Sequence, residues 1–118
     1  MLYDKRWDKL EAAVELEPWR QLLLEAADVI EQRGWCRHTR MNSRGEVCAV
    51  GAILSARWGF DRLDWGSWYD DEPTREAVLN LRARVASGTI SGVGGWNDTP
   101  DRTKDEVVAM LRDVAQKD

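Results

Sequence analysis

The chain has 118 residues and a formal net charge of −4, with 43% hydrophobic and 32% charged residues. This length and composition are those of one folded domain with its own core, and they exclude a disordered chain. The negative charge argues against general binding of a nucleic-acid backbone, which needs a basic surface. No apolar run is long enough to span a membrane, and the first residues lack the apolar core of a signal peptide, so we expect a cytoplasmic protein.

Apolar residues recur at intervals of three or four, which is typical of amphipathic helices. The first such stretch covers residues 3–14. The second begins at Glu17-Pro18, where a proline in the first turn loses no hydrogen bond, and ends at Gly34. Residues 47–58 are apolar on nearly every face, which predicts a helix buried at the centre of a bundle. A pair of buried strands is the alternative for this segment, and its alanines favour the helix.

Capping signals define the last two predicted helices. An acidic, proline-containing start at residues 71–74 predicts a fourth helix that ends before Gly88. The last helix follows Thr103, which has the spacing of a capping box with Glu106. No linker or internal repeat divides the chain, so we predict one compact all-α domain over residues 1–118, a bundle of about five helices.

Three short motifs follow one another along the chain. They are Gly34-Trp35-Cys36, then Cys48-Ala49-Val50-Gly51-Ala52-Ile53, then Trp96-Asn97-Asp98 followed by Arg102-Thr103. Their order resembles a family of short bacterial and phage proteins catalogued as domain of unknown function 6197, from about Leu22 to Leu111. The resemblance implies a single domain and no known activity. It makes the following residues hallmarks of the fold: Trp35, Cys48, Gly51, Trp96, Asn97, Asp98, Arg102 and Thr103.

This chain departs from the family pattern at one turn. After the first Trp-Cys the pattern often has Gln-Gly, whereas this sequence has Arg37-His38. Any role that the family assigns to that turn is therefore not carried over to this chain.

Cys36, His38 and Cys48 combine two thiols with an imidazole, and Asp98 is a fourth candidate ligand for zinc. Their spacing matches no compact zinc knuckle, and a cysteine in an apolar helix is usually a small buried hydrophobe. We therefore predict no metal and no cofactor. The same side chains suit nucleophilic catalysis, with Cys36 as thiolate, His38 as base and Asp98 as the orienting acid. Because residues two apart do not face one another on regular structure, this alternative needs a special turn. A packed, inert thiol is the competing interpretation.

The glycines at positions 88, 92, 94 and 95 are candidates for an anion-binding loop ahead of the last helix. They lack Gly-Lys-Ser/Thr and a βαβ context, so neither the Walker nor the dinucleotide motif applies. Trp96-Asn97-Asp98 is better interpreted as a turn, with the indole as anchor and the next two residues in Asx turns.

The segment 58–72 combines aromatic residues, including three of the seven tryptophans, with acids. Residues 61–72 hold five acids and one arginine, whereas residues 33–45 hold four arginines and no acid. The acidic segment either folds onto the basic one and covers the core, or forms an exposed surface. An exposed surface would suit a basic protein partner, with aromatic anchors and acids that steer the encounter. The expected contact residues are Asp64, Trp65, Trp68, Tyr69 and Asp70.

We therefore predict a small accessory or regulatory protein that acts through protein–protein interaction, with a phage or host-modulating role. The alternative function is a small-ligand site or a cysteine-dependent enzyme. Its site would lie between the Trp35-Cys36 turn and the Trp96-Asn97-Asp98 loop, provided that these two motifs meet in space.

Overall fold

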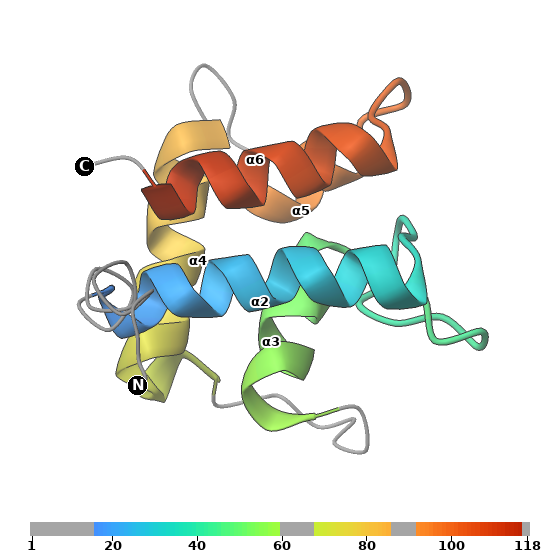
Figure 1. Cartoon of the computed structure of the whole chain (residues 1–118). Coiled ribbons are helices and arrows are strands. Elements are labelled where there is room, and N and C mark those ends of the chain that lie inside the picture. Colours follow the sequence, from blue (N-terminus) through green and yellow to red (C-terminus); the bar gives the residue numbers. More distant parts are fainter. Residues whose placement is uncertain (1–15, 60–67, 86–91, 117–118) are drawn as a thin grey trace, which may run out of the picture.

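A computed structural model describes residues 16–59, 68–85 and 92–116. In these ranges the chain forms α-helices, one short 3-10 helix and no β-strand, which confirms the prediction of an all-α domain. Figure 1 shows α2 and α6 side by side and antiparallel, with α4 crossing near one end of the pair. α2 packs against α3, α4 and α6. The predicted first helix, residues 3–14, lies outside the described residues.

α2 (Pro18–Arg33) begins and ends where the sequence predicts. Gly34 follows it with a φ of 100°, a region of backbone space that favours glycine, and its N–H donates to the Ile30 carbonyl at 2.8 Å. One face of the helix supplies the core residues Leu22, Leu23, Ala26, Ala27 and Ile30.

α3 (Ala49–Trp58) begins two residues later than the predicted boundary at residue 47. Val47 instead makes isolated bridges to Trp35 and Met41, so its backbone is extended and committed to the preceding loop. Cys48 is the N-cap, and its sulfur accepts a hydrogen bond from the Gly51 N–H at 3.3 Å. Ala49 and residues 51–55 are buried, which places buried side chains on more than one face of this helix.

α4 (Glu72–Val85) follows the short helix η1 (Trp68–Asp70), and Asp71 connects the two. The Thr74 N–H and hydroxyl both donate to Asp71 Oδ2, at 3.2 and 2.7 Å. Arg57, near the end of α3, donates to both carboxylate oxygens, and this pairing lowers the pKa of Asp71 to about 2. Asp71 therefore caps α4 and ties it to α3. The predicted stop at Gly88 lies outside the described residues.

α5 (Gly92–Asn97) is a short helix. The sequence had been interpreted here as a glycine loop followed by a turn at Trp96-Asn97-Asp98. That interpretation was wrong for residues 92–97, because burial of Val93 and Trp96 offsets the low helix propensity of glycine. α6 (Lys104–Gln116) has the predicted capping box. The Thr103 N–H donates to Glu106 Oε1 at 3.0 Å, and the Glu106 N–H donates to Thr103 Oγ1 at 3.2 Å.

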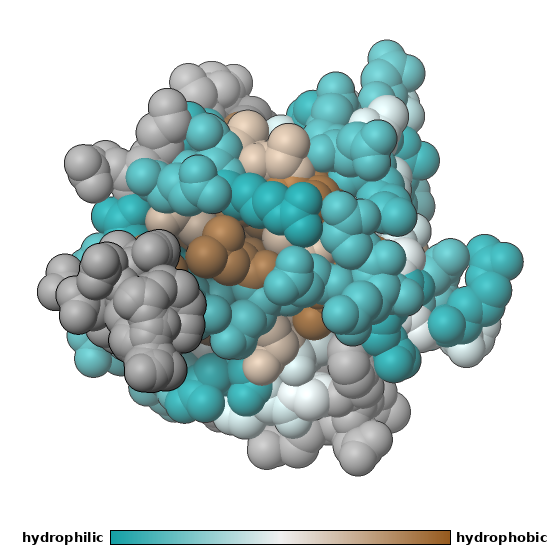
Figure 2. All heavy atoms as spheres, viewed as in Figure 1, coloured by the Kyte–Doolittle hydropathy of each residue, from teal (hydrophilic) through white to brown (hydrophobic). Residues whose placement is uncertain are grey.

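The contact between α2 and α6 has apolar and charged parts. Figure 2 shows hydrophobic residues surfacing in a small area between these helices, surrounded by hydrophilic ones. Ion pairs also join them: Arg112 lies 3.3 Å from Asp28 and 3.4 Å from Glu31, and Lys104 lies 3.7 Å from Glu31. No helix in the described part of the chain is long and apolar enough to cross a bilayer.

Candidate functional site

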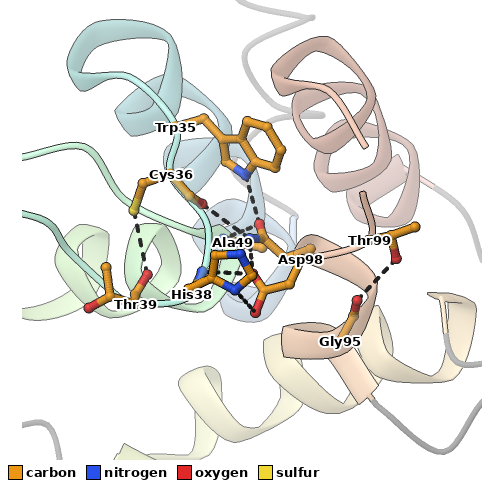
Figure 3. A network of polar contacts seen from close by, with 9 residues as sticks. Trp35, Cys36, His38, Thr39, Ala49, Gly95, Asp98 and Thr99 are labelled. Carbon is orange, nitrogen blue, oxygen red and sulfur yellow. Dashed lines mark hydrogen bonds and ion pairs between the residues drawn. The ribbon is translucent and has the colours of Figure 1, made fainter. Parts of the chain in front are cut away.

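The motifs of the sequence meet at the side chain of Asn97, which is fully buried. Its Oδ1 accepts hydrogen bonds from the Trp35 indole N–H at 2.7 Å and from the Ala49 N–H at 3.0 Å. Its Nδ2 donates to the Cys36 carbonyl at 3.1 Å and to Asp98 Oδ1 at 3.0 Å. Every hydrogen-bonding position of the amide is thus used. Figure 3 shows Trp35, Cys36, Ala49 and Asp98 converging on this point; with Asn97 they form the Asn97 cluster.

The Asn97 cluster joins elements that are distant in sequence. The Ala49 N–H belongs to the first residue of α3, where helix donors lack partners within the helix. Asn97, the last residue of α5, supplies that partner from another part of the chain. The same side chain holds the Trp35-Cys36 turn, so its hydrogen bonds fix the turn, the start of α3 and the end of α5 together.

Two arginines, each lying over a tryptophan ring, hold the turn after α5. The Arg37 guanidinium lies 4.8 Å from the centre of the Trp35 ring and donates to the carbonyls of Pro100 and Arg102, at 2.9 and 2.6 Å. The Arg102 guanidinium lies 4.5 Å from the centre of the Trp96 ring and donates to the Trp96 carbonyl at 3.0 Å. This role of Arg37 could not be predicted, since no local sequence pattern links Arg37 to residues more than 60 positions away.

Asp98 and His38 form the exposed edge of the cluster. Asp98 Oδ1 accepts the His38 backbone N–H at 2.9 Å, and Asp98 Oδ2 lies 3.7 Å from His38 Nδ1. Burial raises the pKa of Asp98, but the hydrogen bonds from His38 and Asn97 outweigh it, so the pKa lies below its usual value. His38 has a φ of 71°, in the left-handed region of backbone space that favours glycine. The chain therefore bends at residues 37–40.

That turn does not bring the Cys36 thiol to His38. The Cys36 thiol instead points to the carbonyls of Thr39 and Glu46, at 3.5 and 3.3 Å, and Figure 3 shows its sulfur directed toward Thr39. The Cys36 residue is 9% exposed, and burial raises the pKa of its thiol to about 11. Burial also raises the pKa of the Cys48 thiol. Both cysteines are free and buried, and thiols in this state are weak nucleophiles.

We expect both thiols of the folded protein to react slowly with 5,5′-dithiobis(2-nitrobenzoate). A pKa near 11 leaves roughly a hundredfold less thiolate at pH 8 than an unperturbed cysteine has. The time course of colour release should therefore be slow in buffer and immediate for both thiols in guanidinium chloride. A fast phase in buffer that disappears in a Cys36→Ser variant would contradict this expectation. Cys36 would then again be a candidate nucleophile.

The described residues contain no group of three or more histidine, cysteine or acidic side chains placed to hold a metal ion. The candidate ligands have other partners: the Cys36 thiol faces backbone carbonyls, and the Cys48 sulfur accepts the Gly51 N–H. Only His38 and Asp98 face each other.

At least two grooves occur on the described surface, and the second is lined in part by Trp96 and Arg102. One, of about 350 Å³, has as its lining residues Glu17, Pro18, Trp19, Glu72, Pro73 and Glu76. Another, of about 500 Å³, is lined by Trp96, Arg102, Glu106, Ala109, Met110 and Asp113. Neither of these two grooves is lined by Cys36, His38 or Asp98.

The predicted contact surface is described only in part. Asp64, Trp65 and the side chain of Trp68 lie outside the described residues. The Tyr69 residue is 56% exposed, and Asp70 is exposed beside it.

The chain is a small all-α domain in which Asn97 and its partners hold the Trp35-Cys36 turn to the ends of α3 and α5. This chain belongs to the family of unknown function DUF6197, whose family model matches residues 15–117. The family resemblance inferred from the motifs is thereby confirmed. Neither a curated protein nor a solved structure matches the chain.

Proposed function

We propose that this protein acts by binding a basic protein partner rather than by catalysis. The polar groups of the candidate site already have partners within the protein: the Asn97 amide has its full set of hydrogen bonds, and the buried Cys36 thiol faces backbone carbonyls. Such groups are not available to a substrate without breaking the fold. This leaves the surface as the source of function, and it speaks against the cysteine-dependent alternative.

The observation that carries the proposal is the exposure of Tyr69. At 56% it is one of the two large hydrophobic side chains most open to solvent among the described residues. It lies beside the exposed Asp70, within a segment whose net charge is negative. An exposed tyrosine bordered by acids is typical of an anchor for a basic partner, because the ring supplies contact area and the acids steer the approach.

The setting that we propose is cytoplasmic and regulatory, which includes modulation of a host by a phage protein. Both cysteines are free thiols, as is usual in a reducing compartment.

Affinity capture tests the proposal. The purified protein is immobilised and exposed to an extract of the organism that encodes it, and retained proteins are quantified by mass spectrometry. We expect a basic protein whose retention falls about tenfold or more with Tyr69→Ala and with Trp65→Ala/Trp68→Ala, since aromatic anchors carry a large share of binding energy.

Leu79→Ala is the matched control, because Leu79 is 46% exposed on α4 but is not part of the acidic segment. This variant should retain the partner as the unaltered protein does. Equal loss with Leu79→Ala would indicate nonspecific hydrophobic retention, and retention that none of the aromatic variants changes would refute the proposed surface.

A further inference from the structure

We infer that the groove between the N-terminal ends of α2 and α4, the α2–α4 groove, binds an arginine-rich segment of a partner protein. The inference rests on the proposed function for its claim that the ligand belongs to a protein. It adds a binding site with defined residues, and Glu72 connects this site to the acidic segment 58–72.

The shape and chemistry of the α2–α4 groove suit a side chain that is both flat and cationic. Its volume of about 350 Å³ is near the lower end of ligand-binding pockets. The six lining residues comprise one tryptophan, two prolines and three glutamates, with no basic residue among them. Rings therefore supply apolar walls, and the carboxylates supply a negative rim. Figure 1 shows the two helix ends that form it lying close together.

Two of the three carboxylates of the groove, Glu72 and Glu76, have no cationic partner among the described residues. Glu72 and Glu76 are four residues apart on α4, a spacing at which like charges on a helix repel. Glu72 is in the first turn, where the helix dipole offsets this cost, but Glu76 lies beyond it. Neither forms an ion pair within the described residues, whereas Glu17 pairs with Arg20 at 2.7 Å. A cation held between Glu72 and Glu76 would relieve their repulsion.

The protein itself shows how residues of this groove hold a guanidinium group. Arg20 lies with its guanidinium carbon 4.5 Å from the centre of the Trp19 ring, and its Nε donates to Glu17 Oε1. This hydrogen bond lowers the pKa of Glu17. Stacking on an aromatic ring together with carboxylate pairing favours arginine over lysine, because the planar guanidinium does both at once. Because Arg20 already pairs with Glu17 and stacks on Trp19, we expect the ligand's arginine to pair with Glu72 and Glu76, the two carboxylates that remain.

The test uses a synthetic probe and a ¹⁵N-labelled protein. The probe is the peptide acetyl-Arg-Gly-Arg-Gly-Arg-amide, and its lysine counterpart and spermidine are compared with it. We expect saturable shifts of the Trp19 indole resonance and of the amides in the first turns of α2 and α4. The arginine peptide should bind more tightly than the lysine peptide and spermidine.

Charge variants identify the groove as the binding site. Glu72→Gln/Glu76→Gln should weaken binding of the arginine peptide by about five- to tenfold, since each rim charge contributes modestly. The same variant should melt within a few degrees of the unaltered protein, because the repulsion that it removes is offset by the loss of the favourable interaction between Glu72 and the helix dipole. The matched control is Asp105→Asn, an exposed carboxylate at the start of α6, which should change the affinity less than about twofold.

Some outcomes would overturn the inference. Equal binding of spermidine and the arginine peptide would reduce the groove to a general polycation site, and equal weakening by Asp105→Asn would mean attraction by overall charge. Failure here is distinguishable from failure of the proposed function. If capture finds a partner that Glu72→Gln/Glu76→Gln retains fully, the groove is refuted and the function stands. If the peptide binds the groove but no partner is captured, the function is refuted and the groove remains a site for arginine peptides.

Discussion

Replacing Asn97 by alanine should lower the free energy of unfolding by about 3 kcal/mol or more, because it leaves several buried polar groups without partners. The Trp35 indole N–H, the Ala49 N–H and the Cys36 carbonyl would each lose the hydrogen bond that Asn97 provides. A loss of this size is a large share of the stability of a small domain. Urea denaturation followed by circular dichroism measures it directly, and the thermal midpoint should fall by roughly 10 °C or more.

Two further variants show whether the effect comes from the amide. Asn80, on α4, donates one side-chain hydrogen bond, to the Glu76 carbonyl at 2.8 Å, and Asn80→Ala should cost about 1 kcal/mol or less. Asn97→Asp keeps the oxygen that accepts from Trp35 and Ala49, loses both donors, and places a second carboxylate beside Asp98. We expect it to fall between the unaltered protein and Asn97→Ala. If Asn97→Ala costs no more than Asn80→Ala, the Asn97 cluster does not hold the fold together.

The parts of the fold that the sequence predicted correctly are those with local signals. Pro18 and Gly34 mark the two ends of α2, and the pair Thr103 and Glu106 marks the start of α6. These signals act within a few residues, since a cap satisfies donors or acceptors of its own helix. They can therefore be interpreted without knowing what lies next to the helix in space.

The parts that the sequence could not predict depend on distant partners. Trp35 and Asn97 are 62 positions apart, and nothing local indicates which group the indole N–H will meet. The same holds for α5, whose glycines predict a loop until the burial of Trp96 is known. The start of α3 was misplaced because Val47 continues the apolar run while its backbone bridges to residues before it. The order of the motifs marked the correct residues but did not specify their contacts.

Replacing Gly51 by alanine should destabilise the protein by about 3 kcal/mol, although alanine normally stabilises a helix relative to glycine. A Cβ atom at Gly51 would lie 2.0 Å from the carbonyl oxygen of Arg40 and 2.8 Å from its carbon. These are backbone atoms, and the same oxygen accepts the Cys48 N–H at 3.2 Å, so it cannot move without disturbing the Met41–Val47 bridge that precedes α3. The close approach explains why a glycine occupies this hallmark position in the first turn of a buried helix.

Gly94→Ala provides the matched comparison, because Gly94 lies in α5 and a Cβ there would meet no atom within 4 Å. This variant should be neutral or gain about 0.5–1 kcal/mol from the higher helix propensity of alanine. The two substitutions make the same chemical change in two helices, so their difference in urea midpoint isolates the contact with Arg40. Opposite signs are expected, and a Gly51→Ala protein as stable as Gly94→Ala would mean that the loop over α3 yields freely. In that case the loop that carries Trp35 and Cys36 would not be held rigidly against α3, and the Asn97 cluster would have to position it alone.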